Sequence, residues 1–579
     1  MAQTFSAPRA AWRGLCLSIL GCLVLGCHKP AVPVVATDAP WFEDVSTEVG
    51  LDFVHDPGPV DGRYFMPQMT GAGSALFDFD GDGRLDIYLV NNGGPKGRPN
   101  RLFRQMPDGH FEDVSKGSGL DFSGYCQGVA IGDVNNDGHP DVLVTEYRGV
   151  RLFINNGNGT FTEETVQSGL DNPLWATSAA FVDYDRDGWL DLVVVNYVNY
   201  DPVKDCLTTN GQRDYCAPNS FVGTVTKLYR NLGKQPAGKG PRVRFEDRTI
   251  PSGLAAHAGP GLGVLCADFD GDGWPDLFIA NDGKPNHLWI NQKDGTFREE
   301  AVMRGVAFNA MGTAEGNMGI AWGDVDGDGL QDLFVTHLST ETNTLWKQDP
   351  RGLYQDRTAL SGLHRPTTRA TGFGTVLGDF ANAGVLDVAI VNGAVLRSSP
   401  TETGANRFWS QYAQRNQILA NDGTGRFRDL SSANAGAKGL CGYENVGRGL
   451  AVGDVSNDGS LWLLATSVAG RVRLYRNVAP ERGHWLVMRA FDPFSKRDAL
   501  GAEVTVRAGK RVWVRTVQSN GGFVTSNDAR AHVGLGKVEQ VDSIDVLWPD
   551  GTAEVFATDG VDRHIELRKG KGKSAPGKR

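Results

Sequence analysis

The chain has 579 residues, of which 40% are hydrophobic and 22% charged, and its formal net charge is −10. These fractions exclude a disordered or collagen-like chain, and without a basic excess a nucleic-acid binder is not expected. Glycine, at 75 residues, is nearly twice as frequent as its ordinary share of ~7%. Together with 27 prolines and no Gly-X-Y period, this excess predicts many tight turns and therefore β structure.

The beginning of the chain has the features of a secretion signal. Two arginines precede an apolar run that is too short to span a bilayer as a stable helix. The run ends in Val-Leu-Gly-Cys, which resembles a bacterial lipobox. By that resemblance residues 1–27 are a lipoprotein signal peptide, Cys27 carries the lipid, and residues 28–40 tether the protein to the periplasmic or surface side of the cell envelope. Ile19-Leu20-Gly21-Cys22 is a shorter alternative for the lipobox, and an ordinary signal peptide that contains a cysteine is the other alternative.

An acidic loop of nine residues recurs along the chain, each time between two short apolar runs. It has Asp at positions 1, 5 and 9, Asp or Asn at position 3, and Gly at position 6. Successive copies begin 50 to 85 residues apart. Five copies are intact and two later ones have lost carboxylates: the intact copies are 78–86, 133–141, 183–191, 268–276 and 324–332, and the decayed copies are 379–387 and 454–462.

Each repeat also contains further apolar phrases, of the types Arg-Leu-Phe-Ile-Asn and Phe-Glu-Asp-Val. Short apolar segments separated by Gly and Asn turns predict strands, and four strands per repeat, seven times over, predict an all-β fold with a seven-bladed β-propeller at 41–478. The last repeat lacks its fourth segment, whereas Phe42-Glu43-Asp44-Val45 stands unused before the first loop. We therefore expect this N-terminal strand to complete the seventh blade.

The five intact loops place 19 carboxylates around tightly turned backbone. Oxygen ligands in a flexible arrangement suit Ca²⁺ best, with the backbone carbonyl of position 7 as a further ligand, whereas Mg²⁺ requires a stricter octahedron. Turns capped by Asp side chains could explain one such loop without a metal, but not five in register. The sequence predicts about five structural Ca²⁺ sites, formed by Asp78, Asp80, Asp82, Arg84, Asp86, Asp133, Asn135, Asp137, His139, Asp141, Asp183, Asp185, Asp187, Trp189, Asp191, Asp268, Asp270, Asp272, Trp274, Asp276, Asp324, Asp326, Asp328, Leu330 and Asp332.

The acidic phrase on a β repeat resembles the FG-GAP/VCBS repeats of integrin α-subunit propellers. Beyond Val478 the loops stop, and alternating apolar and polar residues predict a small β-sandwich-like module at 479–567. Residues 568–579 are basic and are expected to form a disordered tail. Several phrases of the module resemble the ASPIC/UnbV domain: Leu500-Gly501-Ala502-Glu503-Val504, Ser519-Asn520-Gly521-Gly522-Phe523, His532-Val533-Gly534-Leu535-Gly536 and Leu547-Trp548-Pro549-Asp550-Gly551.

This order of parts is similar to that of the cartilage acidic protein family. The resemblance implies a secreted, calcium-binding protein with a matrix or adhesion role. The UnbV name also connects the C-terminal module with biosynthetic gene clusters, without a defined chemistry.

The cysteines outside the first segment fall into two groups. Cys206 and Cys216 flank a polar loop and, in an exported protein, are predicted to form a local disulfide. Cys126, Cys266 and Cys441 lie in small apolar settings and are expected to be free thiols.

No nucleophile elbow, zinc-protease helix or phosphate-binding loop occurs in the sequence. The first functional hypothesis is therefore a monomeric, non-enzymatic binding or adhesion module, which contacts a protein or glycan through propeller loops and the insertion around Cys206 and Cys216. The alternative is an envelope enzyme, either a lyase or hydrolase acting on a glycan or small molecule or an enzyme with a UnbV-like biosynthetic role, whose site lies at the propeller channel. Titratable residues converging on the channel mouth would favour the alternative.

Overall fold

The computed structural model describes residues 39–208, 210–234, 241–398 and 407–576. Cys27 and the predicted signal peptide lie outside these residues. Strands dominate the described chain, and none of its helices has the length and apolar character needed to cross a bilayer. The helical segments are single turns: α1 (Pro67–Thr70), η1 (Pro218–Ser220), η2 (Leu254–Ala256), α2 (Ala301–Arg304), α3 (His364–Thr367) and α4 (Arg407–Ser410).

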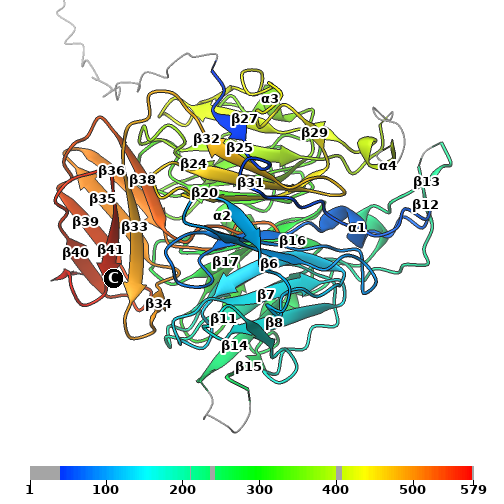
Figure 1. Ribbon diagram of the computed structural model, residues 1–579, viewed down its shortest axis with the longest axis horizontal. Coiled ribbons are helices and arrows are strands. Elements are labelled where there is room, and N and C mark those ends of the chain that lie inside the picture. Colours follow the sequence, from blue (N-terminus) through cyan, green and yellow to red (C-terminus); the bar gives the residue numbers. More distant parts are fainter. Residues whose placement is uncertain (1–38, 209, 235–240, 399–406, 577–579) are drawn as a thin grey trace, which may run out of the picture.

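Seven four-stranded antiparallel units follow one another as blades, which confirms the predicted propeller (Figure 1). Blades 1 to 3 are β2 (Ser74–Phe77), β3 (Asp86–Leu89), β4 (Arg101–Gln105), β5 (Phe111–Asp113); β6 (Cys126–Gly132), β7 (Asp141–Glu146), β8 (Gly149–Asn155), β9 (Phe161–Glu163); and β10 (Ala176–Val182), β11 (Asp191–Asn196), β14 (Lys227–Lys234), β15 (Val243–Asp247). Blades 4 and 5 are β16 (Gly261–Ala267), β17 (Asp276–Asn281), β18 (His287–Asn291), β19 (Phe297–Glu299); and β20 (Ile320–Gly323), β21 (Asp332–Val335), β22 (Thr344–Gln348), β23 (Tyr354–Asp356). Blade 6 is β24 (Gly372–Gly378), β25 (Asp387–Asn392), β27 (Gln417–Asn421), β28 (Phe427–Asp429).

Blade 7 closes the ring with the N-terminal strand, as predicted. It consists of β30 (Gly447–Gly453), β31 (Trp462–Ser467), β32 (Arg473–Asn477) and β1 (Phe42–Asp44). β1 pairs antiparallel with β32, with Phe42 opposite Asn477 and Asp44 opposite Tyr475. The backbone hydrogen bonds of β1 therefore join the two ends of the repeat array.

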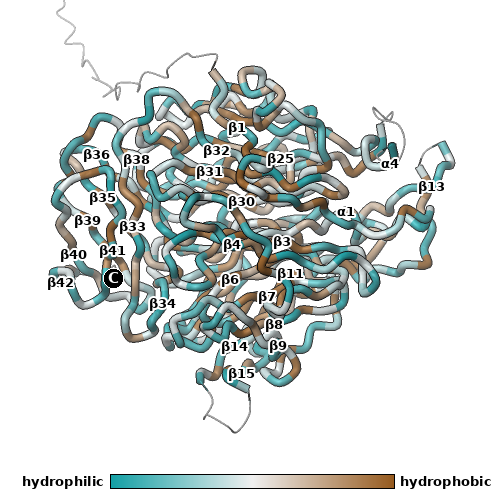
Figure 2. The backbone as a smooth tube through the Cα atoms, viewed as in Figure 1, coloured by the Kyte–Doolittle hydropathy of each residue, from teal (hydrophilic) through white to brown (hydrophobic). Residues whose placement is uncertain are grey.

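The hydrophobic core lies between neighbouring blades. Figure 2 shows apolar residues along the strands and hydrophilic residues along the outer loops. One cluster, for example, joins Ile87 and Leu89 of blade 1 to Leu464 and Leu474 of blade 7, all of them fully buried. Because every blade is covered on both faces by its neighbours, its first two strands are buried on both sides, as in β6 and β7, and this explains their continuous apolar runs.

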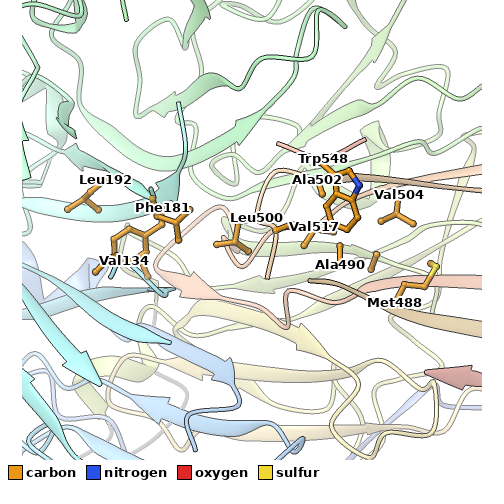
Figure 3. Packing of buried hydrophobic residues seen from close by; sticks show 14 of the residues in the cluster. Val134, Phe181, Leu192, Met488, Ala490, Leu500, Ala502, Val504, Val517 and Trp548 are labelled. Atoms are coloured by element: carbon orange, nitrogen blue, oxygen red, sulfur yellow. The ribbon is translucent and has the colours of Figure 1, made fainter. Parts of the chain in front are cut away.

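The C-terminal module is a sandwich of two sheets, in agreement with the expectation. One sheet contains β34 (Arg497–Asp498), β33 (His484–Asp492), β38 (Ala531–Gly536) and β41 (Arg563–Arg568), and the other contains β36 (Arg511–Thr516), β35 (Glu503–Ala508), β39 (Ser543–Leu547), β40 (Ala553–Phe556) and β42 (Lys573–Ala575). Its core continues into the propeller, since Leu500 lies between Val517 of the module and Phe181 of blade 3 (Figure 3).

The expectation of a disordered tail at 568–579 is wrong for most of the residues that the structure describes there, 568–576. β41 extends to Arg568, and β42 pairs antiparallel with β40, with Lys573 opposite Val555. Backbone pairing to an open sheet edge orders this segment despite its basic side chains, because the ladder of hydrogen bonds does not depend on side-chain polarity.

A segment of the C-terminal module, residues 519–527, lies inside the propeller channel and contacts the first strands of all seven blades. It includes β37 (Thr525–Ser526), which pairs parallel with β2. Val129 and Val264 donate backbone hydrogen bonds to Val524 and Gly522 at 3.2 and 3.0 Å, and Val524 donates to the Ser178 hydroxyl at 3.1 Å.

The remaining contacts of this segment complete the ring. The Thr525 hydroxyl donates to Leu450 at 3.2 Å, Phe523 packs on Phe373, and Gly522 lies against the carbonyl of Ile320. Glycines on the first strands leave room for it, since a Cβ on Gly263 would come within 2.6 Å of the Gly522 carbonyl oxygen. We call residues 519–527 the channel segment.

The opposite end of the propeller carries the longest insertions. Figure 1 shows β12 (Cys206–Leu207), β13 (Arg213–Asp214), α1 and α4 on the far side from the C-terminal module. The predicted disulfide between Cys206 and Cys216 is formed, and Cys126, Cys266 and Cys441 are free thiols as expected. A small two-stranded sheet pairs β26 (Gln414–Arg415), which follows the insertion of blade 6, with β29 (Glu444–Asn445), which precedes the first strand of blade 7. We call this end of the molecule the insertion face.

Candidate functional site

The carboxylate at position 9 of each intact acidic loop joins two backbone segments by hydrogen bonds, and we call it the backbone clamp. Each of these carboxylates is fully buried and accepts two backbone N–H groups at 2.7–3.1 Å, one from position 2 and one from the third strand of the blade. Burial raises the pKa of Asp86 and Asp332 to about 8. Removal from water disfavours a lone carboxylate there, so a nearby cation would stabilise its ionised form.

Position 1 orders the turn itself. Its carboxylate accepts the N–H of the position-6 glycine at 2.8–3.0 Å in all five intact loops. The position-5 carboxylate likewise accepts the N–H of position 7 at 2.8–3.0 Å. The loops therefore contain Asp-capped turns, in which some of the carboxylate oxygens accept hydrogen bonds from backbone N–H groups.

Four of the five intact loops nevertheless gather three acidic side chains whose oxygens lie within 4.8 Å of one another. In loop 1 the group is Asp78, Asp80 and Asp82; in the others it is positions 1, 3 and 9, namely Asp183, Asp185 and Asp191; Asp268, Asp270 and Asp276; and Asp324, Asp326 and Asp332. Loop 2 forms no such group among the described residues, since Asn135 takes the place of an acid at position 3.

Several ligand-position oxygens have no hydrogen-bond partner in the described structure although they are buried. They are Asn135 Oδ1, Asp183 Oδ1, Asp185 Oδ1 and Asp326 Oδ1. A buried polar atom without a partner is costly, and a hard cation with oxygen ligands would satisfy it. The donor sets of these loops therefore fit a divalent cation, including loop 2, where Asn135 supplies a neutral oxygen.

Basic side chains line the rims of four loops, which the sequence analysis did not foresee. Arg104 lies 2.6 Å from Asp80, and Arg230 lies 2.6 Å from Asp185. Lys293 pairs with Asp272 at 3.0 Å and Lys347 pairs with Asp326. These residues stand on or just beyond the third strand of the same blade. Each rim carries fewer basic than acidic groups, so these loops retain a net negative charge.

The two decayed loops face the C-terminal module, as loops 2 and 3 also do, where Arg497 of the module donates to Asn136 at 2.9 Å and to the Gly188 carbonyl at 3.3 Å. Position 1 keeps its turn-capping role, because Asp379 and Asp454 accept the N–H groups of Gly384 and Gly459 at 2.7 and 3.0 Å. Positions 3 and 5 of the first decayed loop are Ala381 and Ala383, so two of its ligands are lost.

Basic side chains of the C-terminal module lie next to the remaining aspartates of the two decayed loops. Arg515, which is partly buried, lies near Asp379. Burial raises the pKa of the Asp379 carboxyl to about 6, and the positive charge of Arg515 acts against this rise. His564 Nε2 lies 3.1 Å from Asp454, and Arg530 donates to the Asp454 carbonyl at 3.0 Å. The module thus docks on the loop face of the propeller and supplies positive charge to the decayed loops.

Side chains of the described residues fill the channel around the channel segment. Phe523 is fully buried inside it, and Met66, Trp175 and Met318 fill it from the insertion face. Two cavities that border the channel segment measure about 120 and 50 Å³. Volumes of this size hold a few water molecules rather than a sugar chain.

Matches to known families follow the same division of the chain. Residues 493–574 match the family described as ASPIC and UnbV, and residues 78–144, 133–194 and 268–335 match the FG-GAP-like repeat. The chain carries FG-GAP-like repeats and an ASPIC and UnbV domain. It is also 27% identical over 317 residues to cartilage acidic protein 1 of Homo sapiens, which confirms the predicted resemblance. That match covers 53% of this chain and 44% of the human protein, so the chain spans less than half of that relative.

Solved structures with a related arrangement are distant. YCF48 bound to D1 peptide has a TM-score of 0.40 and 9% identity, with 78% of this chain and 98% of that chain covered. The rhamnogalacturonan lyase PL11 of Bacillus licheniformis has a TM-score of 0.35 and 14% identity, with 76% and 75% covered. Scores this low support no conclusion about function.

Proposed function

We propose that this chain is a calcium-stabilised, non-enzymatic binding module of the cell envelope, anchored through Cys27, whose insertion face engages a protein or glycan partner. The observation that carries this proposal is the position of the channel segment. Because the C-terminal module covers the loop face and fills the channel, the insertion face is the end of the propeller left for a partner.

Calcium is assigned to the five intact loops. The converging carboxylates and the buried oxygens without partners support oxygen-ligated cations, and extracellular calcium modules bind with dissociation constants of about 10⁻⁴–10⁻³ M. Each ion would join the turn between the first and second strands to the clamp at position 9. The role assigned to calcium is therefore structural.

The insertion face has the exposed apolar character of a contact surface. Val203 is 84% exposed and Val222 76% exposed, and Leu207, Val60 and Leu396 are also exposed. The disulfide between Cys206 and Cys216 limits the freedom of the hairpin that carries Leu207, which reduces the entropy lost on binding. Similarity to cartilage acidic protein 1 also supports a module outside the cell.

The test compares two surface variants in a pull-down from envelope extract with calcium present. In the first, Val203→Ser, Leu207→Ser and Val222→Ser are combined on the insertion face. In the control, Val302→Ser and Met303→Ser remove exposed apolar groups from α2, elsewhere on the propeller. We expect the partner retained by the unchanged chain and by the control to be lost from the insertion-face variant. Equal retention by both variants would contradict the proposal.

A further inference from the structure

A cleft lies between blade 6 and the C-terminal module, separate from the insertion face. Figure 1 shows β33, β36 and β38 of the module beside the propeller, and residues 478–483 link β32 to β33. This linker, the first decayed loop and the starts of β33 and β36 border the cleft, whose volume is about 1270 Å³. Pockets for drug-sized ligands measure about 300–1,000 Å³, so the cleft has room for a ligand of several rings.

One wall of the cleft is apolar because the first decayed loop has lost its ligands. Ala381 and Ala383 stand at positions 3 and 5, where the intact loops carry side-chain oxygens, and both are half-buried. Val385, Ala420 and Pro480 extend this apolar surface. The decayed loop therefore presents methyl and methylene groups, which fit the apolar faces of a ligand rather than a cation.

Trp485, at the start of β33, adds an aromatic surface to the cleft. Its indole ring packs so closely on Gly459 that a Cβ there would lie 2.0 Å from the ring. His564 meets the indole edge-on, with the ring centroids 5.3 Å apart. The ring is therefore held in place, although Trp485 is only half-buried and lines the cleft. A side chain that is already fixed loses little freedom when a ligand packs on it.

Charged side chains of both signs stand around the apolar wall. Glu481 and Arg482 belong to the linker, and Lys537 and Glu539 follow β38. All four are exposed, and none forms a hydrogen bond or an ion pair within the described chain. Two of them are hydrogen-bond acceptors and two are donors, so together they suit ligand groups that both donate and accept.

Backbone groups along the cleft are already paired. Gly483 of the linker donates to the Ala381 carbonyl at 2.9 Å, and Gly536 of the module donates to the Asn382 carbonyl at 2.8 Å. A peptide that adds to a sheet edge relies on free main-chain groups of this kind. Recognition in the cleft therefore depends on side chains.

We propose that this cleft binds a segment of a neutral oligosaccharide. The C–H faces of sugar rings can pack on Trp485 and the alanines, while each hydroxyl can donate to a carboxylate and accept from a cation. A polyanionic glycan is not expected, because the exposed and half-buried lining side chains have no basic excess. The acids are Asp458, Glu481, Glu539 and Asp562, and the bases are Arg482, His484, Arg511 and Lys537.

The test measures binding of chitohexaose and of cellohexaose, both neutral, to the purified chain saturated with Ca²⁺ in a calorimeter. Hexagalacturonate, which carries a carboxylate on each sugar, is the control ligand. Arg482→Ala combined with Glu539→Ala removes one donor and one acceptor from the cleft, and this variant is expected to fold because both residues are exposed. Lys510→Ala with Asp559→Ala is the matched control, since these exposed residues of the same module do not line the cleft.

The unchanged chain and the control variant should bind a neutral hexasaccharide, and the cleft variant should bind it roughly tenfold more weakly. Failure of the folded chain to bind either neutral sugar, or equal affinity in the cleft variant and the control, would overturn the proposal. Tighter binding of hexagalacturonate than of both neutral sugars would overturn it as well. The insertion-face variant should bind the sugar unchanged, so this result is independent of the partner proposed for that face.

Discussion

The ring of Phe523, in the C-terminal module, lies 5.4 Å from the ring of Phe373 on the first strand of blade 6. The two residues are 150 positions apart in the chain, and both are buried in a cluster that also contains Trp175 and Met318 of blades 3 and 5. This contact makes the module a part of the propeller core rather than an appended domain. Unfolding of the module should therefore expose the core of the propeller.

Phe523→Ala should destabilise the whole chain. Removal of a fully buried phenylalanine costs about 3–5 kcal/mol, because the surrounding residues fill the cavity only in part. Urea unfolding in the presence of Ca²⁺ measures the effect. Phe494→Ala is the control in the same module, since its side chain is 83% exposed and its loss should change stability by less than about 0.5 kcal/mol. Similar small effects of both changes would show that the channel segment is not tightly packed.

Asp272→Ala should lower thermal stability only when Ca²⁺ is present. Asp272 is position 5 of loop 4 and lies next to the cluster of Asp268, Asp270 and Asp276. Without the ion, loss of one carboxylate relieves repulsion among the others and offsets the lost contact with Lys293. Melting in Ca²⁺ and in chelator measures the difference, and Asp294→Ala, in an exposed turn, is the control. An equal loss in chelator would contradict a metal role for this loop.

Arg515→Met should behave in the opposite way, with the same loss in Ca²⁺ and in chelator. Arg515 Nε donates to the His532 carbonyl at 3.0 Å, and the positive charge of Arg515 lowers the pKa of buried Asp379. Its removal leaves a carbonyl without its donor and leaves Asp379 in a loop that lacks other ligands, which should cost about 1–3 kcal/mol. The control is Arg507→Met, which breaks an exposed pair with Asp545 worth about 0–1 kcal/mol. A loss seen only in Ca²⁺ would mean that the decayed loop still depends on an ion.

The propeller fold could be predicted from the sequence because the repeats can be recognised directly in it. The position of Phe42 before the first loop, together with the missing segment after Asn477, predicts the closure that β1 and β32 make. Cys206 and Cys216 were predictable for a similar reason, since local spacing decides whether they can meet.

The channel segment was not predictable from local pattern. Ser-Asn-Gly-Gly-Phe has neither helical nor strand periodicity, and its backbone is extended by contacts with seven separate blades. Gly522 is required there because a Cβ would lie 2.2 Å from the Ile320 carbonyl oxygen, a neighbour 202 positions away. The positive charge that Arg515 brings near Asp379 was missed for the same reason, because only the docking of the two domains brings these residues together.

His55 provides a test of pH dependence. It lies in the loop before α1, is 3% exposed, and accepts the N–H of Ala469 at 3.3 Å; burial lowers its pKa to about 3. The unfolded chain takes up a proton as the pH falls through about 6.5, whereas folded His55 does not until about pH 3. The stability that neutral His55 contributes is therefore complete above pH 6.5 and is lost as the pH falls from 6.5 towards 3, at up to about 1.4 kcal/mol per pH unit.

His55→Gln keeps an acceptor for Ala469 but cannot titrate, so it should lose less stability than the unchanged chain between pH 6.5 and pH 4. Chemical unfolding at several pH values in saturating Ca²⁺ measures both slopes. The carboxylates and the other histidines titrate equally in the two proteins, so the difference between the slopes belongs to His55. Parallel curves across this range would mean that His55 is accessible to protons in the folded state and that its burial in the loop against blade 7 is not maintained in solution.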